Sequence, residues 1–260
     1  MDAVRENYYH KYINDSKNML KAMPLVHVCD CFTLRKILAT GVISPTLCQV
    51  FKKQLSYFFY GRPSYRVGQN NCTSNAVSMF PICFIIEPSQ ITSISGAYPF
   101  DTGAFHSGYF SRYVHPKSSV FDYELVGELE FIQKFVGYFY ETNSSYYDGV
   151  SNISNSSLPA MAYELQSVYQ MITSQTTEEF DDRCHTIEIQ SSQAINLSSG
   201  GIKAMVLPSS IAQDPDISAF LLDNDVEPII YHTTRCSPSS VTSTIITEVR
   251  KYYETEGVFQ

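Results

Sequence analysis

The chain has 260 residues, of which 44% are hydrophobic and 17% are charged, a balance that supports a packed core and argues against broad disorder. Its formal net charge of −8 disfavours a protein that coats nucleic acid generally, which needs a surplus of Lys and Arg, but leaves room for a local basic groove. Tryptophan is absent beside 19 Tyr and 16 Phe, so any stacking surface must be built from Tyr and Phe.

The seven cysteines are odd in number, and no Cys-x-x-Cys pair occurs. We therefore expect free thiols in a reducing compartment, with neither a disulfide framework nor a zinc site. The segment from Met1 to Tyr9 lacks the apolar stretch of a signal peptide. No run approaches the roughly 18 apolar residues of a membrane-spanning helix. The sequence thus predicts a cytoplasmic protein that does not enter a membrane.

Four signals mark the elements of the first third of the chain. Pro24 ends a run of apolar residues at helical spacing, and Gly41 follows a second such run as its C-terminal stop. Ser44 and Pro45 are a plausible N-cap and first-turn pair. The predicted elements are, in order, helix 3–22, strand 25–28, helix 33–39, helix 46–54, aromatic strand 55–60 and central strand 81–87.

The rest of the chain alternates irregular and periodic segments. Residues 88–120 lack a clean period and predict a long functional loop, and residues 142–158 predict a polar loop. Together the patterns predict one α+β domain over 1–260, with a helical insertion at about 120–180. The periodic segments predict helix 120–141, helix 159–172, strands 184–190 and 203–207, helix 214–222, strand 228–232 and helix 241–253.

His27 lies on the apolar strand 25–28 and has two interpretations. It is either a satisfied core histidine or a site residue. In the second case the backbone fixes one ring nitrogen while the other nitrogen meets a ligand hydroxyl.

The segment from Tyr57 to Arg66 is the least ordinary stretch of the chain. In a strand Tyr57 faces one side and Tyr60 the other, so one face can be core while the other lines a cleft. Arg62 and Arg66 are close to this aromatic wall and could pair with a pyrophosphate. The alternative is a buried aromatic strand followed by two surface arginines.

Glu188 shares a face with Thr186 and Gln190 by strand alternation, opposite Ile187 and Ile189. It is either a solvent-facing carboxylate or a carboxylate in a cleft. In a cleft it would hydrogen-bond a ribose hydroxyl and stabilise an oxocarbenium-like transition state.

Other arrangements of reactive residues are poorer. Cys184 and His185 are neighbours on a predicted strand and so point to opposite faces, which excludes a nucleophile–base pair. Asp181 and Asp182 read as a solvated acidic loop, and we expect no bound metal. The triplet beginning at Asp101 resembles that of an aspartic protease only superficially, because it occurs once. The Walker A, Gly-x-Ser-x-Gly, Gly-x-Gly-x-x-Gly and His-Glu-x-x-His motifs are absent.

Together, His27, the aromatic segment and Glu188 resemble the ADP-ribosyltransferases of the His-aromatic-Glu type, in particular the DarT-like enzymes that modify nucleic acids in bacterial defence and toxin–antitoxin systems. In those enzymes a His-bearing first strand precedes a helix of the pattern Asn-Leu-x-x-Ile-x-x-x-Gly, which the segment from Thr33 to Gly41 resembles. The resemblance covers roughly residues 24–66 and 183–207. The usual aromatic-Asn-x-Arg run is replaced by Tyr-Gly-Arg-Pro around Arg62, so the choice between Arg62 and Arg66 stays open.

The resemblance implies split antiparallel β-sheets with flanking helices, and NAD as the substrate. It implies transfer of ADP-ribose to a macromolecule, with RNA or DNA as the first choice, by a toxin whose host needs an antitoxin partner. The alternatives are a non-catalytic module that binds NAD or another nucleotide, and an NAD glycohydrolase. The implied catalytic residues are His27, Arg62 and Glu188, and the implied NAD-binding residues are His27, Tyr57, Tyr60, Tyr65 and Arg66.

Overall fold

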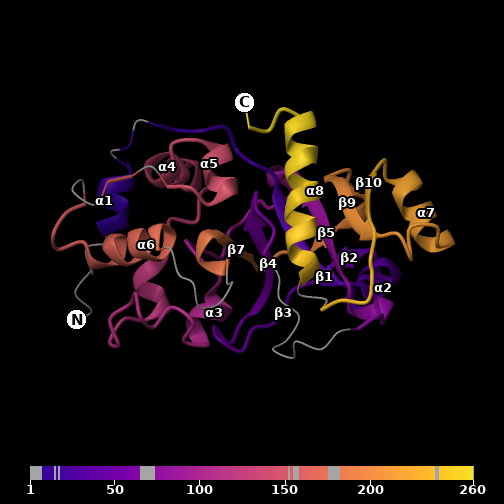
Figure 1. Cartoon of the computed structure of the whole chain (residues 1–260), viewed down its shortest axis with the longest axis horizontal. Coiled ribbons are helices and arrows are strands. Elements are labelled where there is room, and N and C mark those ends of the chain that lie inside the picture. Colours follow the sequence, from indigo (N-terminus) through magenta and orange to yellow (C-terminus); the bar gives the residue numbers. More distant parts are fainter. Residues whose placement is uncertain are drawn as a thin grey trace. The chain divides into compact units, whose positions relative to one another are not determined.

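A computed structural model gives the chain a mixed α+β fold with a mostly antiparallel sheet, a small second sheet and helices (Figure 1). The chain divides into two compact units. Unit 1 comprises Met1–Ala22, Ile94–Ile189 and Phe259–Gln260, and unit 2 comprises Met23–Ser93 and Gln190–Val258. The expected insertion at about 120–180 falls inside unit 1. The structure describes residues 8–14, 16, 18–64, 74–151, 153–154, 158–174, 182–237 and 240–259.

The sheet of unit 2 has the strand order β10-β9-β5-β1-β4. Neighbouring strands pair antiparallel except for β10, which runs parallel to β9. A second, two-stranded sheet pairs β2 with β8. The bounds are β1 Leu25–Asp30, β2 Val42–Ile43, β4 Gln54–Tyr60, β5 Pro81–Ile86, β8 Ile195–Asn196, β9 Ile202–Pro208 and β10 Glu227–Tyr231.

Strand β5 forms the centre of this sheet, as its apolar sequence predicts. All six of its residues are buried, and it pairs with β1 on one side and β9 on the other. A strand with no polar position has both faces covered. Strand β10 lies at the end of the sheet order and contains Pro228, a residue that strands tolerate at an edge because proline has no N–H to donate.

Local signals in the sequence set the ends of the helices of unit 2. The carboxylate of Asp30 accepts from the Thr33 N–H at 2.7 Å, and Gly41 ends the same helix in the left-handed region at φ 69°. Asp214 caps a second helix through the N–H groups of Asp216 and Ile217. The helices are α2 (Cys31–Thr40), α7 (Pro215–Asp223) and α8 (Val241–Thr255), and the short 3-10 helices are η1 (Val77–Met79), η2 (Pro88–Gln90) and η6 (Leu197–Ser199).

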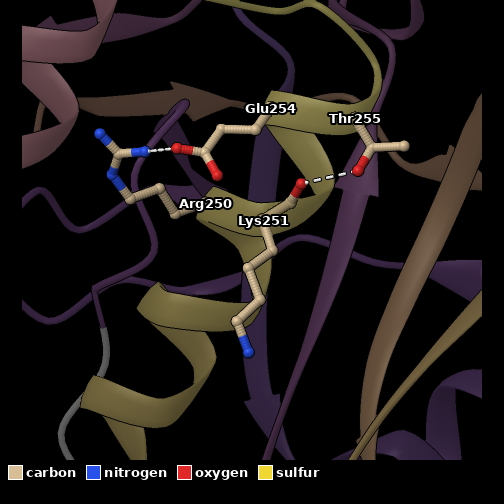
Figure 2. Close-up of polar contacts among 4 residues, drawn as sticks. All are labelled: Arg250, Lys251, Glu254 and Thr255. Atoms are coloured by element: carbon tan, nitrogen blue, oxygen red, sulfur yellow. Dashed lines mark hydrogen bonds and ion pairs between the residues drawn. The ribbon is translucent and has the colours of Figure 1, made fainter.

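Helix α8 lies against β5, β9 and β10 (yellow in Figure 1). Its buried residues recur every four positions, the spacing of an amphipathic helix face: Val241, Ile245, Val249 and Tyr253. Two further contacts support the last turns (Figure 2): Arg250 pairs with Glu254, and the Thr255 hydroxyl donates to the Lys251 carbonyl at 3.1 Å. An exposed (i, i+4) ion pair such as Arg250–Glu254 contributes about 0.3–0.5 kcal/mol.

The predicted helix over 46–54 is wrong, because these residues form a hairpin. Strand β3 (Thr46–Leu47) pairs antiparallel with β4, and the Cys48 N–H donates to the Lys53 carbonyl at 2.8 Å. Lys52 takes a positive φ of 55° in the turn, and the Cys48 sulfur accepts from the Val50 and Phe51 N–H groups. Pairing with the start of β4 outweighs the helix-start signal of the Ser-Pro pair.

Unit 1 is mostly helical, and several of its bounds differ from the predicted ones. Among the described residues of the predicted helix 3–22, only Tyr8–Asn14 (α1) is helical, and residues 18–22 are irregular. The predicted helix 120–141 is divided into η3 and α4. The predicted loops 88–120 and 142–158 contain β6, α3 and α5. The predicted strand 184–190 begins only at Glu188, because Cys184 and His185 lie in a 3-10 turn. The bounds are α1 Tyr8–Asn14, β6 Gly96–Tyr98, α3 Thr102–His106, η3 Val120–Tyr123, α4 Leu129–Tyr140, α5 Asn143–Asp148, α6 Tyr163–Thr173, η5 Asp182–His185 and β7 Glu188–Ser191.

Strand β7 crosses the unit boundary, since Glu188–Ile189 belong to unit 1 and Gln190–Ser191 to unit 2. None of the helices in the described part of the chain has both the length and the apolar character needed to cross a bilayer.

Candidate functional site

His27 is held by the backbone through one ring nitrogen. Its Nδ1 lies 2.9 Å from the carbonyl oxygen of Tyr57, and since a carbonyl only accepts, Nδ1 carries the proton. Burial lowers the pKa of His27 from its ordinary value of 6.5, while the bond to the Tyr57 carbonyl acts in the opposite direction. The imidazole is therefore neutral at pH 7, and its Nε2 presents a lone pair.

The position of His27 follows from the strand pairing. The β1–β4 ladder pairs Leu25 with Tyr60 and Val26 with Phe59, whereas the β1–β5 ladder continues to Asp30. His27 is thus the first residue of β1 beyond its backbone pairs with β4. At this point the imidazole of His27, rather than a backbone N–H of β1, donates to the Tyr57 carbonyl of β4.

The aromatic surroundings of His27 come from both neighbouring strands. Its ring centroid lies 5.6 Å from that of Phe58 on β4 and 6.3 Å from that of Phe84 on β5. Both phenylalanines are fully buried, while His27 is half-buried. The rings beside His27 are therefore those of Phe58 and Phe84, neither of which is among the site residues that the sequence predicts.

Tyr60, which the sequence predicts to stack on nicotinamide, belongs to the core. Its exposed fraction is 0%, and its hydroxyl accepts from the Met23 N–H at 3.0 Å. Burial raises the pKa of Tyr60 to about 12. Its ring and its hydroxyl both support the start of β1.

Tyr57 is half-buried on β4. By strand alternation its ring lies on the face opposite Phe58, and therefore opposite the His27 ring. Tyr57, which the sequence predicts to stack on the nicotinamide ring, therefore lies on the other face of β4 from the ring of His27. Tyr65 and Arg66 lie outside the described residues.

Arg62 follows a turn that is fixed on several sides. Gly61 has φ +65°, its N–H donates to the Pro24 carbonyl at 2.8 Å, and its own carbonyl accepts from the Tyr253 hydroxyl at 2.9 Å. A Cβ at Gly61 would come within 2.6 Å of the Met23 side chain, so glycine is needed for both conformation and space. Arg62 itself is 6% exposed, which corrects the alternative of a surface arginine. A buried guanidinium is a fixed positive charge suited to phosphate.

Glu188 is 2% exposed and lies in unit 1. Its Oε1 accepts from the Thr102 hydroxyl at 2.7 Å, and its Oε2 accepts from the Thr102 N–H at 3.0 Å. Ile187 and Gln190 are buried as well, so the segment has no exposed face, and the interpretation of Glu188 as a solvent-facing carboxylate is wrong.

The structure therefore separates the predicted site residues into two sets. His27, Tyr57, Tyr60 and Arg62 belong to unit 2, and Glu188 belongs to unit 1. Sequence reasoning missed Thr102, which it placed in an irregular loop. A carboxylate partner 86 positions away leaves no local signal.

Unit 2 also contains a cavity of about 680 Å³ between α2 and α7. Its walls are largely apolar, with Leu34 and Leu38 from α2 and Ile217 and Phe220 from α7. None of the predicted site residues is among the described residues that line it. Within the described parts of the chain, no group of three His, Cys, Asp or Glu side chains is arranged to hold a metal ion.

Comparison of the chain with protein-family models, with curated proteins and with solved structures gives no match.

Proposed function

We propose that this chain is an NAD-dependent ADP-ribosyltransferase, which cleaves the bond between nicotinamide and ribose and transfers ADP-ribose to a macromolecule. The bond from His27 Nδ1 to the Tyr57 carbonyl is the observation that carries the proposal. It fixes a neutral imidazole so that Nε2 can accept a hydrogen bond from a ribose hydroxyl.

The buried Glu188 carboxylate supports the second half of the chemistry. Breaking the glycosidic bond of NAD develops positive charge on the ribose ring, and a fixed carboxylate in a low-dielectric environment stabilises that charge. Glu188 is 2% exposed and hydrogen-bonded through both oxygens. In the proposed function it faces the oxocarbenium-like ribose and serves as general base toward the acceptor.

The remaining roles follow from the charge and ring chemistry of NAD. The buried guanidinium of Arg62 would bind the pyrophosphate, with Arg66 as the alternative from the sequence. The nicotinamide needs an aromatic wall. The Tyr60 ring is enclosed in the core, so the proposal assigns this wall to Tyr65.

The acceptor is proposed to be nucleic acid, RNA or DNA, and the biological setting a cytoplasmic toxin of a toxin–antitoxin or anti-phage defence system. Such an activity harms the cell that makes it, so an antitoxin partner is part of the proposal. The net charge of −8 means that contact with nucleic acid would rely on local arginines rather than on the overall field.

A non-catalytic module that binds NAD or another nucleotide is the second candidate. The observation that favours it is that both oxygens of Glu188 already accept hydrogen bonds from Thr102, as expected for a structural carboxylate. An NAD glycohydrolase would differ from a transferase only in passing ADP-ribose to water.

The test uses the full chain with NAD labelled separately in the nicotinamide and adenine moieties, alone and with RNA, DNA or cell lysate. A transferase releases the nicotinamide label and incorporates the adenine label into one pool. Release without incorporation identifies a glycohydrolase, and binding without release identifies the module. Glu188→Gln should abolish release, whereas Glu130→Gln, at an exposed glutamate of α4, should leave it unchanged.

A further inference from the structure

Thr102 and Glu188 form a two-point contact in the interior of unit 1. The hydroxyl and the main-chain N–H of Thr102 reach different oxygens of the Glu188 carboxylate, at 2.7 and 3.0 Å. The exposed fractions are 1% for Thr102 and 2% for Glu188. One donor would leave the carboxylate free to rotate about its last bond, whereas two donors on separate oxygens fix its plane.

We infer that Thr102 is a positioning residue that fixes the orientation of the Glu188 carboxylate for cleavage of the glycosidic bond of NAD. This inference rests on the proposed function and adds to it a residue from a different segment of the chain. Thr102 does not contact the reacting atoms in this scheme. It acts through Glu188 by keeping the carboxylate in one geometry.

The backbone that carries Thr102 is anchored on both sides of the contact. The Asp101 carboxylate accepts from the Ala104 N–H at 2.7 Å, and the Asp101 N–H donates to the Arg183 carbonyl at 3.0 Å. The rings of Phe100 and Phe105 stack at 5.3 Å with an interplanar angle of 7°. The turn at Thr102 is therefore fixed to the segment that leads into β7.

The strand that carries Glu188 is anchored as well. The N–H of Ile187 donates to the Tyr146 hydroxyl at 3.1 Å, and Ile189 has an exposed fraction of 0%. Because the backbones of Thr102 and Glu188 are both anchored, the Glu188 carboxylate cannot move far if the position of its donor changes. Loss of the Thr102 hydroxyl would remove one hydrogen-bond donor from a buried carboxylate oxygen.

The donors of Thr102 match the acceptor geometry of a carboxylate at Glu188. An N–H can only donate, so the bond from Thr102 N–H to Oε2 is stronger to a carboxylate than to a neutral acid. Burial raises the pKa of Tyr98, and the charges of Glu124 and Glu188 raise it further. Tyr98 thus stays protonated and does not add a second negative charge beside the carboxylate.

The experiment measures nicotinamide release from NAD by the wild type and by Thr102→Val, Thr102→Ala and Thr102→Ser. Valine keeps the shape of threonine but lacks the hydroxyl. Alanine also lacks the hydroxyl and places no additional methyl group near the carboxylate. Serine retains the hydroxyl. We expect kcat to fall about 10- to 100-fold in the Val and Ala variants, with KM for NAD within about threefold. The Ser variant should recover kcat to within about threefold of the wild type.

Controls separate positioning from folding and from failure of the proposed function. Thr247→Val, at an exposed position of α8, should keep wild-type kcat. Melting of each variant gives its folded fraction, and kcat is expressed per folded molecule. Wild-type kcat in folded Thr102→Val or Thr102→Ala overturns the inference alone, as does a Ser variant no better than Ala. Absence of nicotinamide release from the wild type overturns the proposed function, and the inference with it.

Discussion

The imidazole of His27 donates from Nδ1 to the main-chain oxygen of Tyr57 at 2.9 Å, at the position where β1 stops pairing with β4 through its backbone. The His27 side chain therefore makes the hydrogen bond at the point where the backbone pairing of β1 with β4 ends. The tautomer of His27 thus depends on the geometry of the sheet.

His27→Asn and His27→Gln separate the two ring nitrogens. The Asn amide can still donate to the Tyr57 carbonyl but has nothing at the place of Nε2, whereas Gln reaches the Nε2 position and lacks Nδ1. We expect Asn to preserve thermal stability and to weaken NAD binding roughly 5- to 30-fold. Gln should show the reverse pattern. Calorimetric titration with NAD and melting curves measure the two effects, with His232→Ala, at an exposed site, as the control. Equal NAD affinity in the Asn variant and the wild type would exclude a role for Nε2.

The stability of the protein should depend on pH through His27. Its pKa in the folded state lies below the ordinary value of 6.5, chiefly because of burial. Between the folded and unfolded pKa values the unfolded chain binds more protons, so the free energy of unfolding rises with pH in that window. The His27 contribution is complete above about pH 6.5 and is lost as the pH falls through the folded pKa. Urea unfolding of the wild type and of His27→Asn at several pH values isolates the His27 contribution to the free energy of unfolding. A His27→Asn curve parallel to that of the wild type from pH 5 to 7 would argue against it.

Gly61→Ala should destabilise the protein more than Gly41→Ala. Both glycines have positive φ, +65° and +69°, but a Cβ at Gly61 meets the Met23 side chain at 2.6 Å while a Cβ at Gly41 meets nothing within 4 Å. We expect a loss of about 1 kcal/mol at Gly41 from backbone strain alone, and about 2–4 kcal/mol at Gly61 from strain and overlap together. Chemical denaturation of the two variants gives the comparison. Equal losses would mean that Met23 moves aside without cost.

Tyr60→Phe should lower stability and leave NAD turnover unchanged. The substitution deprives the buried Met23 N–H of its acceptor, which costs about 1–3 kcal/mol. KM and kcat should stay within about twofold of the wild-type values, because the Tyr60 ring is enclosed in the core. Steady-state kinetics and urea unfolding on the same preparation decide the matter. A raised KM with unchanged stability would return Tyr60 to the binding site.

The sequence predicts those elements whose signals are local. The apolar run of β5 gave its place at the centre of the sheet, and Gly41 gave the end of α2. His27 was expected on a strand, either as a satisfied core histidine or as a site residue with one nitrogen fixed by the backbone, and its Nδ1 contact with the Tyr57 carbonyl agrees with both interpretations.

The remaining features depend on partners far away in the sequence. The segment 46–54 pairs with β4 instead of forming a helix, and Tyr60 is buried by its contact with the start of β1. Glu188 is satisfied by Thr102 across 86 positions. The sequence around neither residue contains a pattern that predicts the other as its partner.

The bond from Tyr253 to Gly61 spans 192 positions, and it has a consequence for biosynthesis. The sheet of unit 2 is built from two sequence segments, Met23–Ser93 and Gln190–Val258. The turn before Arg62 acquires its hydrogen bond from Tyr253 only when α8 has left the ribosome. Until then β5, β9 and β10 lack the helix that covers them. A nascent chain that stops short of α8 cannot form the complete Arg62 turn, so any activity that needs this turn begins only after α8 has been translated.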